Sequence, residues 1–110
     1  MRTFSCDIET DGIEATKVWC IAVHNIDTDQ CITFVGPCLN LFKPWVVSEA
    51  DCLIFHNGIS FDVPVLEELL DVDFSGIQIE DTLIMSQLYK PRLDGGHSLS
   101  AWGDRLGFAK

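Results

Sequence analysis

The sequence lacks any apolar run of the roughly 18 residues that a membrane-spanning helix needs. Its N-terminus reaches the acidic Asp7 before an apolar segment long enough for a signal peptide can begin, so we expect a cytoplasmic protein. Internal repeats and Ser/Gly/Pro-rich linkers are also missing. A length of 110 residues with 47% hydrophobic and 22% charged residues fits one globular domain, which we assign to residues 1–110.

Basic residues are few, because 7 Lys and Arg stand against 17 Asp and Glu and give a formal net charge of −10. Only Lys90 and Arg92 lie close together in the sequence, so no basic groove is predicted. Affinity for nucleic acid through net charge is therefore excluded, since phosphates are contacted mainly by Lys and Arg. An acidic protein can still act on a phosphodiester when metal ions bridge its carboxylates to the phosphate.

No two of the five cysteines form a Cys-x-x-Cys pair, which argues against a zinc site or a disulfide framework. Most of them lie in or beside apolar, strand-like segments, so we expect reduced and buried thiols. The five are Cys6, Cys20, Cys31, Cys38 and Cys52.

Apolar segments and turn residues follow one another in an order typical of an α/β domain. We expect three strands, then a helix, a strand, a helix, a strand and two helices, forming a mixed sheet with a hairpin at one side. Ser60, Asp81 and Ser98 are expected to cap helices, and Gly107 to end the last one. The expected strands are 3–9, 17–25, 31–36, 52–55 and 76–79, and the expected helices are 39–50, 61–70, 82–90 and 99–106.

Two acids lie on one face of the first expected strand, because side chains alternate with a period of two and Asp7 and Glu9 are two apart. Neighbouring carboxylates repel each other unless a cation lies between them, and hard oxygen ligands suit Mg²⁺ or Mn²⁺. The same pattern also fits an exposed, solvated strand end. A single Asp-x-Glu does not decide between the two interpretations.

A third acid follows the buried strand 52–55, where the polar loop His56-Asn57-Gly58 leads into a helix that carries Asp62 in its first turn. The helix dipole stabilises a carboxylate there. If this strand neighbours the first, Asp62 faces Asp7 across the carboxyl ends of the strands, where open α/β sheets build their sites. The alternative is that Asp62 only complements the dipole and Asn57 only forms a turn.

These motifs resemble those of the DEDD (DnaQ-like) 3′–5′ exonucleases. Asp7-Ile8-Glu9-Thr10 is similar to their first motif, and residues 56–64 are similar to the second. Residues 79–83 and 97–107 resemble in particular the proofreading domain of family A DNA polymerases from short-tailed phages. The resemblance runs from about residue 3 to residue 107 and implies a ribonuclease H-like mixed sheet with flanking helices. A phage-encoded protein would act in the host cytoplasm.

The resemblance also implies a chemistry and a set of residues. Asp7, Glu9 and Asp62 would hold two Mg²⁺ or Mn²⁺ ions and catalyse hydrolysis of the terminal phosphodiester of a DNA strand. The implied partner is single-stranded DNA or a primer 3′ end. His56 either contacts the substrate or ties its loop through the ring nitrogens. The residues expected along the terminal nucleotide are Ile8, Thr10, His56 and Asn57.

The third motif of the family, Tyr-x-x-x-Asp or His-x-x-x-x-Asp, has no counterpart in this sequence. Tyr89 and Asp94 are five apart with Pro91 between them, and Trp102 stands where His97 would need an Asp. We interpret the chain as a C-terminally truncated exonuclease domain that is weak or inactive alone. A polymerase chain would supply the third motif, and an apolar patch would be exposed where the rest of the domain should pack.

Two other functions fit parts of the sequence. Asp7-Ile8-Glu9-Thr10-Asp11 resembles the Asp-x-Asp-x-Thr motif of haloacid dehalogenase-type phosphotransferases, although Glu holds the third position and Thr comes one place early. The other alternative is a non-catalytic remnant domain that binds a polymerase or another partner chain. Trp19, Trp45 and Trp102 are expected to pack against apolar neighbours rather than stack on bases, and His24 and His97 to be structural.

Overall fold

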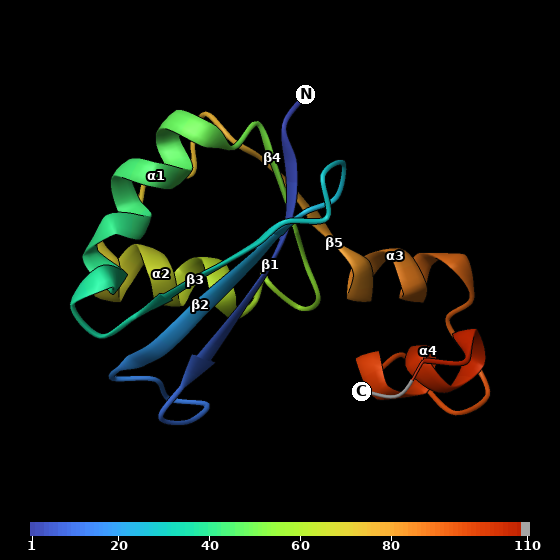
Figure 1. The fold of residues 1–110 in the computed structure, drawn as a ribbon. Coiled ribbons are helices and arrows are strands. Elements are labelled where there is room, and N and C mark those ends of the chain that lie inside the picture. The colour runs from blue at the N-terminus through green and yellow to red at the C-terminus, as the bar shows by residue number, and fades with distance from the viewer. Residues whose placement is uncertain (109–110) are drawn as a thin grey trace.

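Residues 1–108 are described by a computed structural model, shown in Figure 1. The order of strands and helices agrees with the order predicted from the sequence, with one short 3₁₀ helix (η1) added before the first α-helix. The elements are β1 (Thr3–Thr10), β2 (Val18–Asn25), β3 (Cys31–Val35), η1 (Gly36–Leu41), α1 (Phe42–Glu49), β4 (Cys52–Phe55), α2 (Asp62–Leu70), β5 (Gln78–Asp81), α3 (Thr82–Tyr89) and α4 (Leu99–Leu106).

The five strands form one mixed sheet in the order β3-β2-β1-β4-β5. β1, β2 and β3 pair antiparallel as consecutive hairpins, whereas β4 pairs parallel with β1 and β5 parallel with β4. The predicted mixed α/β sheet with a hairpin at one side is therefore confirmed. β1 pairs with β4 only from Thr3↔Cys52 to Ser5↔Ile54, so the second half of β1 continues beyond the end of its parallel neighbour.

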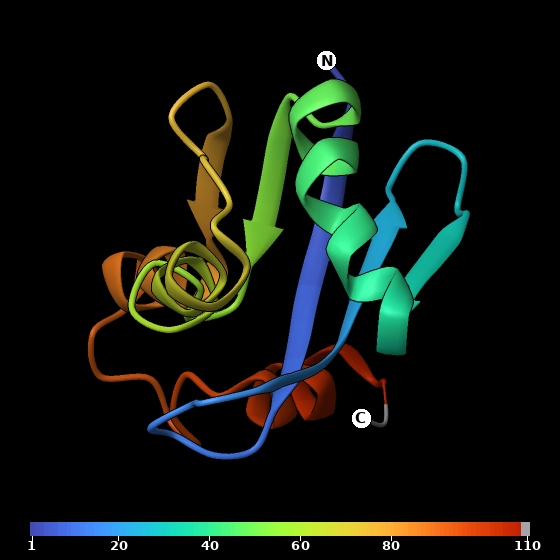
Figure 2. The ribbon, with the colours of Figure 1, turned by 90° about the vertical axis from the view of Figure 1, so that its left-hand side faces the viewer.

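One face of the sheet is covered by α1 and α2, which lie together on the same side of the strands (Figures 1 and 2). β1 contributes to this face through the alternating side chains of Phe4, Cys6 and Ile8, all of them buried. Trp45 from α1 packs edge-on against Phe4, with 4.9 Å between the ring centroids. Burying a large apolar side chain of this kind stabilises a fold by about 1.5–3 kcal/mol, so this face holds the core.

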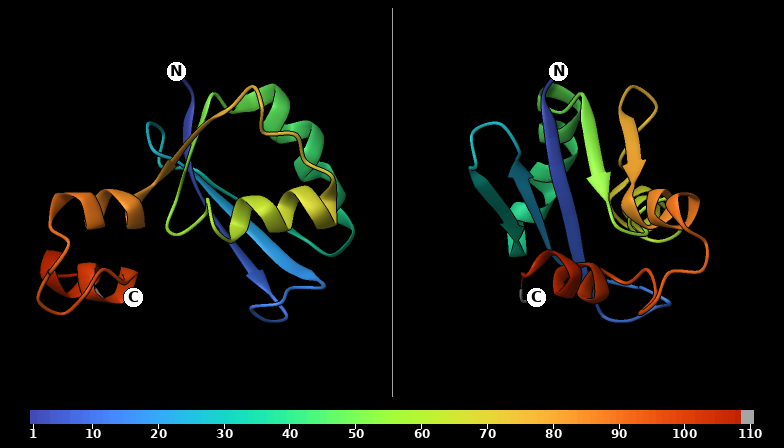
Figure 3. Two further views of the ribbon diagram at one scale, coloured as in Figure 1. Left: turned by 180° about the vertical axis from the view of Figure 1, so that it is seen from behind. Right: turned by 90° about the vertical axis from the view of Figure 1, so that its right-hand side faces the viewer.

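α3 and α4 lie on the side of the molecule away from α1 and α2 (Figures 1 and 3). The Asp81 carboxylate caps α3 and the Ser98 hydroxyl oxygen caps α4, as predicted. Gly107 ends α4 with a φ of 80°, a left-handed conformation that glycine adopts without strain. Ser60, in contrast, does not cap α2: Phe61 precedes the helix, and no side chain caps it.

The prediction of buried thiols is wrong for part of the cysteines. All five are free, but only Cys6 and Cys52 are buried, while Cys31 and Cys38 are exposed. Cys31 belongs to the edge strand β3, which lies at the margin of the core, and Cys38 belongs to η1, which contains no buried residue. Trp19 also departs from expectation: it is 52% exposed, and the Lys17 ammonium lies 4.6 Å from its ring centroid.

Candidate carboxylate site

The structure brings Asp62 next to Asp7, as expected if β4 neighbours β1. β4 ends at Phe55, the chain turns through residues 56–61, and Asp62 begins α2 beside the half of β1 that β4 does not pair with. Asp7 lies on the exposed face of that half, whereas Asp62 is only 6% exposed. The candidate site is thus a pair of carboxylates from two elements, one accessible and one buried.

Asp62 is held in an unusual electrostatic environment. Burial, followed by the negative charge of Asp7, raises the pKa of Asp62 to about 7. Hydrogen bonding from the backbone N–H groups of Asp62 itself and of Ile8 opposes this rise, and the charge of Asp81 adds to it slightly. Asp62 therefore gives up its proton only near neutral pH, and a divalent cation between the two carboxylates would favour its ionised form.

The carboxylates of Asp62 and Asp7 also affect the thiol of Cys6. Burial, with smaller contributions from the charges of Asp62 and Asp7, raises the pKa of the Cys6 thiol well above its ordinary value. A thiol that stays protonated is neither a nucleophile nor a ligand for a hard cation. Cys6 is therefore part of the buried wall behind the pair and not a reactive group.

Glu9, the third predicted ligand, lies two residues beyond Asp7 on β1. It shares the exposed face of β1 with Asp7, and a register shift follows it at Thr10. The charges that raise the pKa of Asp62 come from Asp7 and Asp81. Within residues 1–108, no three His, Cys, Asp or Glu side chains gather closely enough to hold a metal ion. The carboxylate oxygens of Asp7 and Asp62 are the donors that suit Mg²⁺ or Mn²⁺.

Two residues expected along a terminal nucleotide have other roles in the fold. The side chain of Ile8 is buried in the core, so only its backbone is available to a substrate. The Thr10 hydroxyl donates a hydrogen bond of 2.9 Å to the carbonyl of Gly12 and so shapes the turn after β1. Neither of these two side chains, taken alone, indicates a contact with substrate.

His56 ties its loop to the start of α3, one of the two interpretations that the sequence left open. Its Nδ1 lies 2.9 Å from the Thr82 hydroxyl oxygen, and that hydroxyl donates to the carbonyl of Phe55 at 3.1 Å. When the Thr82 hydroxyl hydrogen is directed at Phe55, the neutral His56 ring donates from Nδ1 toward Thr82. The Nε2 lone pair is then left for another partner. Sequence reasoning missed Thr82, which follows the predicted cap directly.

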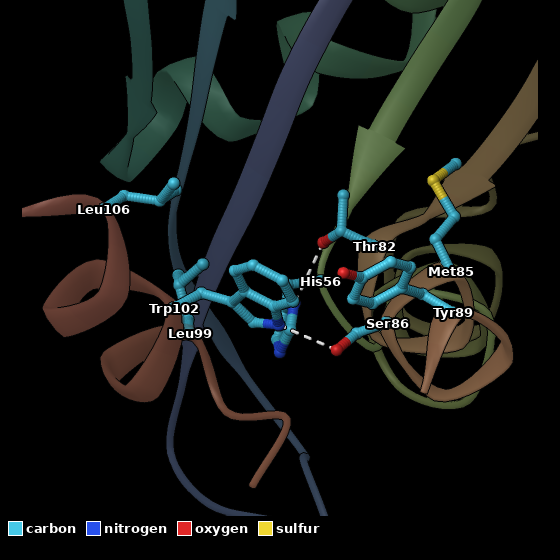
Figure 4. Close-up of a pocket in the computed structure, with 8 residues that line it drawn as sticks. All are labelled: His56, Thr82, Met85, Ser86, Tyr89, Leu99, Trp102 and Leu106. Atoms are coloured by element: carbon cyan, nitrogen blue, oxygen red, sulfur yellow. Dashed lines mark hydrogen bonds between the residues drawn. The ribbon is translucent and has the colours of Figure 1, made fainter. Parts of the chain in front are cut away.

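An apolar pocket of about 420 Å³ opens between α3 and α4, beside His56 (Figure 4). Trp102 Nε1 donates to the Ser86 hydroxyl oxygen at 2.7 Å, and the same oxygen lies 2.6 Å from Nδ1 of His97. These contacts join the two helices and give His97 the structural role expected for it. The lining residues are His56, Thr82, Met85, Ser86, Tyr89, Leu99, Trp102 and Leu106.

A second hollow of similar volume, about 420 Å³, lies against the face of the sheet opposite α1 and α2. Asp7 lines it, and His56, Thr82 and Leu99 line both hollows, so the two are continuous at these residues. Several large apolar side chains of α3 and α4 are exposed. They include Leu88, Tyr89 and Leu106.

A mixed five-stranded sheet with flanking helices, and acidic residues beside the end of its central strand, defines an RNase H-like α/β domain. The sequence profile described as the RNase H superfamily matches residues 5–108, so this chain belongs to that superfamily. No helix in the described part of the chain is long and apolar enough to cross a membrane.

Two DNA polymerases are similar to this chain. In an alignment of 133 positions it is 26% identical to the DNA-directed DNA polymerase of Escherichia phage T7. This alignment covers 94% of this chain and 19% of the polymerase. The chain therefore spans about a fifth of the length of that relative. The family B DNA polymerase of the archaeon Pyrobaculum calidifontis shares the fold, with a TM-score of 0.52 and 22% identity over 70% of this chain and 13% of the polymerase.

Proposed function

We propose that this chain is the metal-dependent 3′–5′ exonuclease (proofreading) domain of a phage-type DNA polymerase, which hydrolyses the terminal phosphodiester of a DNA strand. The observation that carries the proposal is the pairing of buried Asp62 with Asp7 at the end of the central strand. The superfamily match over residues 5–108 and the similarity to a phage DNA polymerase support it.

The pair supplies what a cation site for phosphodiester hydrolysis needs. Asp7 offers exposed carboxylate oxygens from a rigid strand, and Asp62 offers a carboxylate whose proton is held with a pKa of about 7 and is replaceable by a cation. Glu9, on the same face of β1, is proposed as the third ligand. Two bound Mg²⁺ or Mn²⁺ ions would supply a hydroxide nucleophile at neutral pH and neutralise charge on the leaving oxygen.

The remaining groups of the site would orient the strand end. His56 keeps its Nε2 as an acceptor beside Asp7 in the continuous hollow, where it can accept a hydrogen bond from a sugar hydroxyl. Asn57 is exposed on the loop between β4 and α2, with its backbone fixed at a φ of 65°. Both residues are proposed substrate contacts at the 3′ terminus.

The test is digestion of a 5′-labelled single-stranded DNA oligonucleotide in Mn²⁺, followed as a ladder that shortens from the 3′ end. We expect slow stepwise shortening that disappears in Asp7→Asn and in Asp62→Asn. Asp73→Asn is the matched control, because Asp73 is an exposed acid whose carboxylate accepts hydrogen bonds from Ser75 in the next turn and lies outside the site. Digestion that survives both site variants would contradict the proposal.

A second candidate, a non-catalytic domain that binds a polymerase or another chain, is favoured by one observation. Over residues 1–108 the predicted carboxylates do not form a three-membered metal cluster. Titration with Mn²⁺ separates the two functions, since a purely structural domain has no site that depends on Asp7. Saturable Mn²⁺ binding lost in Asp7→Asn supports the exonuclease, and its absence supports the binding domain.

A further inference from the structure

Asp81, at the end of β5, has a carboxylate that is almost wholly inaccessible, with the residue only 4% exposed. Two of the backbone groups that donate to it belong to α3: the N–H of Leu83 at 2.9 Å and the N–H of Ile84 at 3.4 Å. This is ordinary capping of a helix. Two further donors come from a segment more than twenty residues earlier in the chain.

Those donors lie in the loop between β4 and α2. The N–H of Asn57 donates to Oδ1 of Asp81 at 2.9 Å, and the N–H of Ile59 donates to Oδ2 at 3.1 Å. We propose that Asp81 is a positioning residue of the candidate carboxylate site: its carboxylate fixes the loop that places Asp62 beside Asp7. The inference rests on the proposed exonuclease function and assigns a role in it to a residue outside the predicted motifs.

The hold on the loop extends to the residues that flank Asp62. The carbonyl of Asn57 accepts a hydrogen bond from the N–H of Phe61 at 3.1 Å, and the carbonyl of Gly58 accepts one from the N–H of Val63 at 2.8 Å. The Gly58 carbonyl belongs to the same peptide as the Ile59 N–H that Asp81 binds, and the Asn57 carbonyl belongs to the peptide just before it. Moving the loop away from Asp81 therefore moves the first turn of α2 and the carboxylate it carries.

The loop has little freedom to settle in another way. Asn57 adopts a φ of 65°, a left-handed backbone conformation that residues other than glycine rarely adopt. A Cβ on Gly58 would lie 2.2 Å from the Cβ of buried Phe55, so the backbone passes very close to the end of β4. A conformation of this kind persists only where surrounding bonds enforce it, and the Asp81 carboxylate provides two of them.

Asp81 acts through the loop and not as a ligand. Burial by itself would raise the pKa of Asp81, but the hydrogen bonds from Ile59, Asn57, Leu83 and Ile84 together lower it. Four N–H donors engage both oxygens of this buried carboxylate, three at Oδ1 and one at Oδ2, so the group serves the two backbone segments. Asp81 therefore supports the loop that carries a metal ligand without being a ligand itself, and loss of such a residue weakens metal binding by about 10- to 100-fold.

The experiment compares Asp81→Ser and Asp81→Asn with the wild type by amide hydrogen exchange and by titration with Mn²⁺ alone. Serine retains a helix cap for α3 but does not reach the loop. We expect exchange at Asn57 and Ile59 to accelerate by about 10- to 100-fold. The dissociation constant for Mn²⁺ should rise by about 10- to 100-fold in the same variant.

Asparagine gives a graded result that does not depend on the serine variant being folded. Its side-chain oxygen can keep the bond to Asn57, but its NH₂ group meets the N–H of Ile59 donor to donor. We therefore expect faster exchange at Ile59 than at Asn57, with an intermediate loss of Mn²⁺ affinity. Ser98→Ala is the matched control, since Ser98 caps α4 through the N–H of Ala101 and has no contact with the loop.

The outcomes separate this inference from the function on which it rests. Wild-type Mn²⁺ affinity in both Asp81 variants, with Asp7→Asn abolishing binding, overturns the positioning role alone. Unchanged exchange at Asn57 and Ile59 in both Asp81 variants also overturns it, because the loop would then be held by other contacts. Absence of any Asp7-dependent Mn²⁺ binding in the wild type overturns the proposed function, and this inference with it.

Discussion

Replacing Asp62 by Asn should stabilise the metal-free protein at high pH and leave its stability unchanged near pH 4. The pKa of Asp62 is raised from 3.8 to about 7 by burial and by the charge of Asp7. A shift of about 3 units corresponds to about 4 kcal/mol between the two protonation states, at 1.36 kcal/mol per unit. That is the amount by which the ionised carboxylate destabilises the folded chain, and it is absent in the variant.

The direction of the pH dependence follows from proton linkage. A carboxyl group whose pKa is higher in the folded state than in the unfolded state favours folding fully below pH 4, and this contribution is lost as the pH rises through 7. The difference in unfolding free energy between Asp62→Asn and wild type should grow by about 1.4 kcal/mol per pH unit over this window. Acids with a lowered pKa, such as Asp51 and Asp73, change the unfolding free energy only below pH 4, outside this window.

The assay is urea denaturation in the presence of a chelator at pH 4, 5.5 and 8, with both proteins measured side by side. Asp7→Asn is informative as a second variant, because removal of its charge should lower the pKa of Asp62 and shorten the pH window. Asp73→Asn should show no stabilisation at pH 8. A stability difference between Asp62→Asn and wild type that is the same at all three pH values would refute the reasoning.

Three further substitutions probe the scaffold around the site. Gly58→Ala should destabilise the protein by about 3 kcal/mol or more in urea denaturation, because the new Cβ would lie 2.2 Å from Phe55 Cβ and neither backbone has room to move. Ser86→Ala should cost about 1–3 kcal/mol and release α4, seen as a change in Trp102 fluorescence, because a half-buried indole N–H loses its acceptor. Leu66→Ala, at a position with 0% exposure, should cost about 2–5 kcal/mol in thermal or urea unfolding.

Each of these substitutions has a control elsewhere in the chain. Gly76→Ala places a Cβ with no heavy atom within 4 Å, so equal destabilisation there would remove the steric explanation for Gly58. Ser100→Ala changes an exposed serine of α4 and should leave Trp102 fluorescence unchanged. Leu41→Ala removes a leucine that is 57% exposed and should alter stability by less than about 1 kcal/mol.

Most of the fold could be predicted because it depends on local periodicity. The alternation of apolar and polar residues along β1 sets which of its faces meets the core, and the polar loop after β4 marks where a helix begins. The proximity of Asp62 to Asp7 also followed, since it requires only that β4 neighbour β1. The exposure of Cys31 did not follow, because nothing in an apolar segment states whether its strand lies at an edge of the sheet.

The rest of the candidate site depends on side chains that meet across the chain. The contact of Ser86 with His97 and that of Asp81 with Asn57 join residues 11 and 24 positions apart, and no repeat or spacing in the sequence encodes them. Glu9, in contrast, follows from local periodicity, because its spacing of two from Asp7 places both residues on the exposed face of β1.

The link from β5 back to the loop after β4 also orders the events of folding. The antiparallel strands β1, β2 and β3 pair between neighbours in sequence, so this part of the sheet can form while later residues are still being synthesised. The loop after β4 gains its anchor only once Asp81, 24 residues beyond Asn57, has joined the sheet. We therefore expect Asp62 to reach its buried position, and with it the raised pKa, only after residues up to Asp81 have been synthesised.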